Sequence, residues 1–292
     1  MRRSIQYRFT LGHLLFLLFI FMSVSALIVP NNLPAATNQA IPYVSNSPRA
    51  PESSKGWQVA FVKKVALKAD GVFCSGTALD SSWLLTAAHC FVEDCPAILR
   101  EVELYSVAYG STTIDKAKFE DIEKVVISPK WDCRTKANDL ALVRLKKSHA
   151  FTPIQLASHE DSQSALKIGS AFQISGWGYT ELRTTSNELK EGAITIKLAN
   201  ECRRLDNGAL LEGMICAGDI LRNACDGDSG GPLFKRSPAG VIKQFGIVSG
   251  GEGCVDGKPG GVYTEISPHK QWIESTMQSA GCLKSDIDAR LC

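Results

Sequence analysis

The sequence contains a series of short apolar segments, separated by polar turn residues, along most of its 292 residues. Short runs of this kind predict β-strands, and no long amphipathic helix pattern interrupts them, so an all-β sandwich or barrel is expected. In the first half, the predicted strands cover residues 57–62, 72–79, 83–86, 102–109, 122–127 and 140–145. In the second half, they cover residues 171–175, 192–198, 214–217, 232–234, 241–248 and 261–264.

The strands fall into two groups of similar size. Residues 147–166 are mixed and polar and include Pro153, so they are interpreted as the connection between two β units, at about 57–147 and 167–265.

After the last strand, a helix is predicted over about 268–280. Ser267 is the candidate N-cap and Pro268 lies in the first turn. Gly281 is expected to end the helix, and residues 282–292 form a tail.

The N-terminus has the pattern of a secretory signal peptide. Three arginines precede an apolar run from Leu11 to Val24, and small residues allow cleavage after Ala26. Residues 1–26 are therefore the predicted signal peptide, and the Pro-rich residues 27–43 are a linker or pro-segment. An uncleaved membrane anchor over 11–29 is the alternative. A secreted protein is favoured because His13 interrupts the run and a cleavage site follows it.

Charge and cysteine content narrow the possible functions. The formal net charge is +2, which favours neither nucleic acid nor an anionic membrane surface as a partner. The ten cysteines have no zinc-type spacing, and in a secreted protein they indicate disulfides. No metal or organic cofactor is expected.

A glycine-rich stretch, Cys225 to Pro232, carries the strongest chemical signal. Its centre, Gly227-Asp228-Ser229-Gly230, suits a nucleophilic serine, because glycine allows a tight turn beside the substrate. The N–H groups of Gly227 and Ser229 are candidate donors to a developing oxyanion. Read alone, the stretch is also compatible with a surface turn between strands.

Two further residues complete a catalytic set with Ser229. His89 lies in Thr86-Ala87-Ala88-His89-Cys90, directly after a predicted strand, and Asp139 opens a later strand. The order His, Asp, Ser excludes the α/β-hydrolase order, and Ser229 is not in a G-x-S-x-G elbow.

Four motifs carry a family resemblance: Leu-Thr-Ala-Ala-His-Cys at His89, Asn-Asp-Leu-Ala-Leu at Asp139, Ser-Gly-Trp-Gly at 175–178 and Gly-Asp-Ser-Gly-Gly-Pro at Ser229. Over about residues 44–280 the chain resembles a chymotrypsin-fold serine endopeptidase of the trypsin-like family. The resemblance implies two six-stranded antiparallel β-barrels with the active site between them. It also implies that His89 is the general base, that Asp139 orients it, and that protein or peptide substrates are hydrolysed by a monomer.

The resemblance also places a specificity pocket beside Ser229. Asn223 stands where an aspartate selects Lys or Arg, which favours a large apolar or aromatic residue before the scissile bond. Ser249 would support Asp139, and Gly251 and Gly261 would leave the pocket walls open. Gly250 replaces the usual tryptophan. Trypsin-type cleavage, with Glu252 or Asp256 reaching the basic side chain, stays open as the alternative.

In the family, activation frees an N-terminus that pairs with the aspartate before the nucleophile, here Asp228. By position, cleavage between Tyr43 and Val44 would free it, although only Val44 and Ala50 match the family pattern. The alternative is that residues 44–50 are simple linker. An activating protease and protein inhibitors are the further partners implied.

The resemblance pairs six of the ten cysteines. They are Cys74–Cys90, Cys202–Cys216 and Cys225–Cys254. Similar distances from His89 and Asp139 suggest that Cys95 pairs with Cys133. Cys282–Cys292 would then close the tail, unless one of them bonds another chain.

The leading interpretation is a secreted serine endopeptidase made as a zymogen. A protease homologue with a binding or regulatory role is the alternative from a different class, and an esterase or other acyl hydrolase would share the chemistry.

Overall fold

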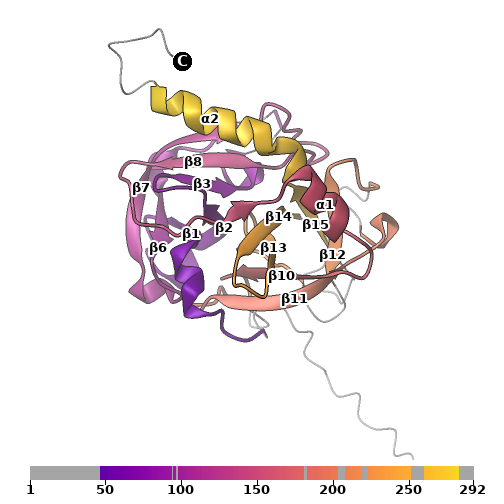
Figure 1. Cartoon of the computed structure of the whole chain (residues 1–292). Helices are drawn as coiled ribbons and strands as arrows, with labels where there is room; N and C mark the ends of the chain where they lie inside the picture. The colour runs from indigo at the N-terminus through magenta and orange to yellow at the C-terminus, as the bar shows by residue number, and fades with distance from the viewer. Residues whose placement is uncertain are drawn as a thin grey trace, which may run out of the picture. The chain divides into compact units, whose positions relative to one another are not determined.

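The computed structural model describes residues 47–93, 95–96, 98–180, 183–202, 208–218, 223–250 and 260–282. Within these residues, two closed antiparallel barrels and a C-terminal helix confirm the predicted fold class (Figure 1). The predicted signal peptide, pro-segment and tail lie outside the described residues. None of the helices in the described part is long and apolar enough to span a membrane.

The first barrel closes in the order β1, β2, β3, β8, β7, β6. Its interior is filled by apolar side chains such as Val59, Leu84 and Leu142, and Phe61 meets Phe91 edge to face with ring centroids 5.1 Å apart. The strands are Gln58–Lys63 (β1), Val72–Ala78 (β2), Trp83–Thr86 (β3), Tyr105–Tyr109 (β6), Lys118–Ile127 (β7) and Ala141–Leu145 (β8).

One strand of this barrel is shorter than predicted. Residues Val102–Leu104 form a 3₁₀ turn (η5), and β6 begins only at Tyr105, where it pairs with Lys63 of β1. The Leu104 side chain is exposed, so burial does not favour an extended conformation there.

The second barrel closes through the order β13, β10, β11, β12, β15, β14, because β13 also pairs with β14. Phe172 and Phe245 meet edge to face inside it, with ring centroids 5.2 Å apart. The strands are Ala171–Gly176 (β10), Lys190–Ile196 (β11), Met214–Gly218 (β12), Pro232–Arg236 (β13), Ile242–Gly250 (β14) and Gly261–Glu265 (β15).

The connection between the barrels is more regular than the sequence suggested. It contains the short strand Gln155–Leu156 (β9), which pairs with β14 in parallel, and the helix His159–Ala165 (α1). Ser158 and Asp161 form a capping box at the start of α1. Hydrogen bonds from Lys243 and from the Ser158 N–H lower the pKa of Asp161 to about 2.

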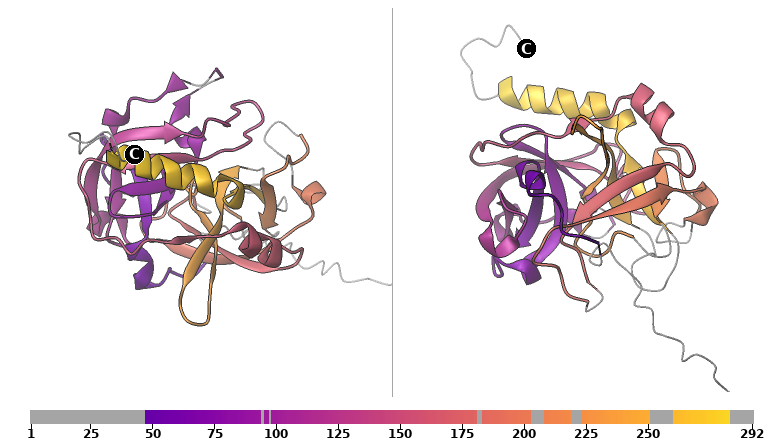
Figure 2. Two further views of the ribbon diagram at one scale, coloured as in Figure 1. Left: turned by 45° about the horizontal axis from the view of Figure 1, so that its top comes forward. Right: turned by 60° about the horizontal axis from the view of Figure 1, so that its bottom comes forward.

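The C-terminal helix packs against the first barrel, although it follows the last strand of the second (Figures 1 and 2). It begins as the 3₁₀ turn Ser267–His269 (η8) and continues as Lys270–Cys282 (α2).

Two predictions about the ends of this helix were wrong. Ile266, without a side-chain cap bond, occupies the N-cap, because the Ser267 hydroxyl bonds to Glu265 instead. The helix also continues through Gly281, since a single glycine lowers helix stability without ending a helix.

Buried polar side chains join the two barrels. The Gln58 amide donates to the Ser175 carbonyl (3.0 Å) and accepts from the Ser175 hydroxyl (2.6 Å). The Thr77 hydroxyl donates to Gln244 (2.8 Å). These groups are buried, and a buried polar group without a hydrogen-bond partner destabilises the fold. The bonds therefore fix the orientation of one barrel relative to the other.

Three of the predicted disulfides are present: Cys74–Cys90, Cys95–Cys133 and Cys202–Cys216. Cys225 is also disulfide-bonded, and its predicted partner Cys254 lies outside the described residues. So do the side chains of the predicted Cys282–Cys292 pair. The bridge Cys74–Cys90 joins β2 to Ala88–Cys90 (η4), the turn that carries His89.

Candidate active site

His89 and Asp139 lie together between the barrels. The His89 Nδ1 atom is 2.7 Å from Oδ2 of Asp139, and the His89 backbone N–H donates to Oδ1 over 2.9 Å. The Ser249 hydroxyl, from β14 of the second barrel, donates to Oδ2 over 2.6 Å. Asp139 is fully buried, so these three bonds fix its orientation.

The contact with Asp139 sets the tautomer of His89. A neutral imidazole whose Nδ1 donates to a carboxylate carries its free lone pair on Nε2. The His89 side chain is 22% exposed, and Nε2 forms no hydrogen bond with another described residue.

Ser229 lies beside the turn that carries His89. The Ser75 N–H donates to its carbonyl oxygen over 2.7 Å, and the sulfur of Cys90 lies 3.7 Å from the same oxygen. Within the described residues, the Ser229 hydroxyl forms no hydrogen bond with His89. Such nucleophile–base bonds often tighten only when substrate binds.

Two backbone N–H groups at this turn form no hydrogen bond with another described residue. Among the described residues, no acceptor faces the N–H of Gly227 or of Ser229. Gly227 has a φ of 92°, which favours glycine, and its carbonyl accepts from the Ser75 hydroxyl over 3.0 Å. Ser75 therefore fixes the turn from the side of the first barrel.

Asp228 is buried beneath the same turn. It accepts hydrogen bonds from the N–H groups of Gly178 (2.8 Å) and Cys225 (2.9 Å). No cationic side chain in the described part of the protein forms an ion pair with it. Burial removes the carboxylate from water and raises the pKa of Asp228 to about 7. An ammonium group would compensate this cost.

Glycines make room for the Asp228 carboxylate. A Cβ atom on Gly176 or Gly178 would overlap with the Asp228 side chain. The Ser-Gly-Trp-Gly motif therefore has a steric function that the sequence analysis did not assign to it.

We expect Gly178→Ala to destabilise the protein by about 1–3 kcal/mol, because the added methyl displaces Asp228. Urea unfolding measures this change. Gly240→Ala is the control: its φ of 80° adds backbone strain, but nothing lies within 4 Å of the new methyl. Only Gly178→Ala should also lower the reactivity of Ser229. Equal reactivity in both variants would contradict the steric role.

The predicted pocket residues are only partly described. Asn223 is buried, with 4% of its surface exposed, and packs so closely on Gly218 that a Cβ there would overlap with its amide oxygen. Gly261 lies against the ring of Tyr263. Gly251, Glu252 and Asp256 lie outside the described residues, as does Val44.

One cluster has the composition of a metal site. Ligand atoms of Cys74, His89 and Cys90 all lie within 4.8 Å of one another. The two sulfurs are bonded to each other, so neither is a thiolate, and the cluster offers a metal only the imidazole.

Sequence reasoning missed Ser75 and Thr86 at this site. Ser75 contacts both Gly227 and Ser229, and the Thr86 hydroxyl donates to the Ser75 carbonyl over 2.8 Å. Neither residue carries chemistry of its own, so only the three-dimensional arrangement shows their function.

Comparison with known proteins gives a consistent result. The family model described as Trypsin matches residues 44–273. The chain is 33% identical over 257 residues to vitamin K-dependent protein C of Rattus norvegicus, covering 80% of this chain and 51% of that protein. It is 34% identical over 218 residues to serine protease 56 of Homo sapiens, covering 71% and 35%. It is 32% identical over 250 residues to tissue-type plasminogen activator of Rattus norvegicus, covering 77% and 43%. The chain spans about half the length, or less, of these curated relatives.

Proposed function

Because the chain belongs to the trypsin family of serine-type endopeptidases, we propose that it hydrolyses peptide bonds through Ser229, His89 and Asp139. The observation that carries this proposal is the 2.7 Å contact between the buried Asp139 carboxylate and Nδ1 of His89. His89 lies on the turn beside Ser229, and its other nitrogen, Nε2, has no hydrogen-bond partner among the described residues.

The reaction has two steps. In the first, His89 Nε2 takes the Ser229 proton while Oγ attacks the peptide carbonyl, and the imidazolium then protonates the leaving amine. In the second, water attacks the resulting acyl-enzyme, with His89 again as base, and releases the acid and free Ser229. The N–H groups of Gly227 and Ser229 bind the oxyanion in both steps.

We propose that the protein is secreted as a zymogen. In support, the family match begins at Val44, and Asp228 is a buried carboxylate without a cationic partner among the described residues. Cleavage between Tyr43 and Val44 would create an ammonium group able to pair with Asp228. N-terminal sequencing of the mature protein tests the cleavage site.

We propose that the protein cleaves after a large apolar or aromatic residue. Asn223 supports this specificity, because a buried neutral amide does not compensate the charge of a buried Lys or Arg side chain. We expect Asn223→Asp to raise cleavage after Arg and Lys, relative to Phe and Tyr, by at least about tenfold. Cleavage profiling on a random peptide pool measures the ratio. Asn223→Gln, which stays neutral, is the control. Wild-type cleavage mainly after Arg or Lys would contradict the proposal.

A fluorophosphonate probe tests the function itself. A cleavage site for a protease of known specificity is introduced directly before Val44. The protein is probed before and after that protease removes the pro-segment. Labelling of Ser229 that appears only after processing supports a zymogen protease. No labelling of the processed wild type would favour the binding homologue instead. Comparison of peptide and ester turnover distinguishes an endopeptidase from an esterase.

A further inference from the structure

Residues 48–50 are attached to the rest of the fold by an isolated antiparallel β-bridge between Arg49 and Lys190. The Ala50 N–H donates to the Leu189 carbonyl (2.9 Å), and the Glu191 N–H donates to the Pro48 carbonyl (3.1 Å). The Leu189 N–H in turn donates to the Thr112 carbonyl of the first barrel (2.7 Å). Both barrels therefore hold the segment that follows the proposed cleavage site.

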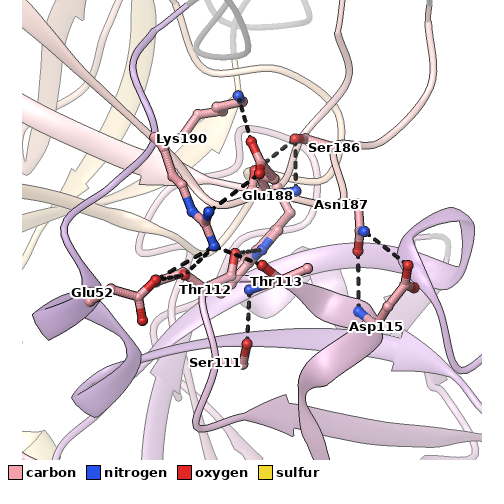
Figure 3. Close-up of polar contacts among 11 residues, drawn as sticks. Glu52, Ser111, Thr112, Thr113, Asp115, Ser186, Asn187, Glu188 and Lys190 are labelled. Atoms are coloured by element: carbon pink, nitrogen blue, oxygen red, sulfur yellow. Dashed lines mark hydrogen bonds and ion pairs between the residues drawn. The ribbon is translucent and has the colours of Figure 1, made fainter.

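Arg49 lies at the centre of this attachment. Its guanidinium donates to Thr113 (3.0 Å) and lies 3.5 Å from the carboxylates of Glu52 and Glu188. Figure 3 shows that Glu52, Thr112, Thr113 and Glu188 gather at one place, although they come from three separate segments of the chain. The Thr112 hydroxyl also donates to Glu52 over 2.8 Å.

These contacts fix the position of residues 48–50 more than they stabilise the fold. The Arg49 side chain is 46% exposed, so solvent screens its ion pairs and they stabilise the fold little. A planar guanidinium with several acceptors nevertheless fixes the register between the segments it joins.

The chain segment that binds Arg49 is also connected to Asp228, through hydrogen bonds of Gly178. Ser186, two residues before Glu188, donates its N–H to the carbonyls of Trp177 (3.0 Å) and Gly178 (3.2 Å), and the Gly178 N–H donates to Asp228 over 2.8 Å. The segment that binds Arg49 thus also positions a donor to the carboxylate.

We propose that Arg49 is a positioning residue for activation: it anchors residues 48–50, so that only residues 44–47 tether the new N-terminus near Asp228. This inference rests on the proposed zymogen mechanism. A short tether raises the effective concentration of the ammonium at its target.

The size of the effect follows from the tether length. With the anchor at Pro48, four residues, 44–47, precede it in the sequence; without the Arg49 contacts, the buried Ala50 still donates to Leu189, so the tether lengthens to at most six residues, 44–49. Effective concentration falls roughly as the −3/2 power of tether length, so losing the anchor lowers it by up to about twofold.

The test uses the full chain processed before Val44 and measures fluorophosphonate labelling of Ser229 against pH. At high pH the ammonium loses its proton and labelling falls. A twofold weaker pairing moves this alkaline half-point down by about 0.3 pH unit. We expect that shift for Arg49→Ala, a larger one for Arg49→Glu, which repels Glu188, and a smaller one for Arg49→Lys.

Lys68→Ala is the matched control, because it removes an exposed ion pair with Asp70 that does not contact this segment. It should leave the half-point unchanged. The anchor is overturned if Arg49→Ala and Arg49→Glu label with the wild-type half-point. If the processed wild type is never labelled, the zymogen mechanism itself fails, and that outcome is recognised before any variant is compared.

Discussion

Replacing Asp139 with asparagine should lower kcat by about 10⁴, with little change in KM. Asparagine offers one acceptor oxygen and an NH₂ group that only donates, whereas Asp139 accepts from His89 twice and from Ser249 once. The amide therefore favours the tautomer with the proton on Nε2, and His89 is no longer a base toward Ser229. Steady-state kinetics on a peptide substrate measures the loss.

Ser249→Ala is the graded control for this prediction. It removes only the 2.6 Å bond to Oδ2 and leaves the imidazole contact in place, so its effect should be much smaller. Circular dichroism confirms that both variants fold. A loss below tenfold in a folded Asp139→Asn variant would remove Asp139 from the proposed mechanism.

Asp228→Asn should lower kcat of the processed protein by at least about 10². A neutral amide does not hold the new ammonium, so the Gly227 and Ser229 N–H groups lose their fixed orientation toward the oxyanion. Asp226→Asn, which changes the exposed neighbouring carboxylate, should keep wild-type kcat. Full activity of a processed Asp228→Asn variant would contradict activation through this residue.

The same substitution should flatten the pH dependence of stability in the unprocessed chain. The folded-state pKa of Asp228, about 7, lies above its unfolded value near 3.9, so the folded state retains a proton that the unfolded state releases. This contribution is fully present below about pH 4, falls as pH rises toward 7, and changes little above that. The total change is about 4 kcal/mol.

Urea unfolding of the unprocessed wild type and of Asp228→Asn, at several pH values between 4 and 8, measures this difference. Subtracting the two curves removes the titration of the other carboxylates. Parallel curves would show that Asp228 keeps its ordinary pKa in the fold.

Much of the fold was predictable because its strands are short, apolar and separated by polar turns. β3 matches its predicted bounds, and both barrels were expected. Two elements escaped prediction for different reasons. β9 exists through its pairing with the distant β14, which leaves no pattern in the sequence. The helix α1 has only seven residues, too few to show a helical period, although Ser158 and Asp161 cap it locally.

The candidate site was predictable where chemistry requires particular side chains. His89, Asp139 and Ser229 stood out by residue type and order, and the proximity of His89 to Asp139 followed. The supporting residues did not stand out. Ser75, an ordinary strand serine, and Arg49, an exposed arginine, owe their contacts only to what the fold places beside them.

The position of α2 makes the first barrel depend on a distant part of the chain. Ile266 and Ile273 belong to the same buried cluster as Val59, Leu84 and Leu142 of that barrel. A fragment truncated before Ile266 would therefore leave apolar surface of the first barrel in contact with water, which destabilises it.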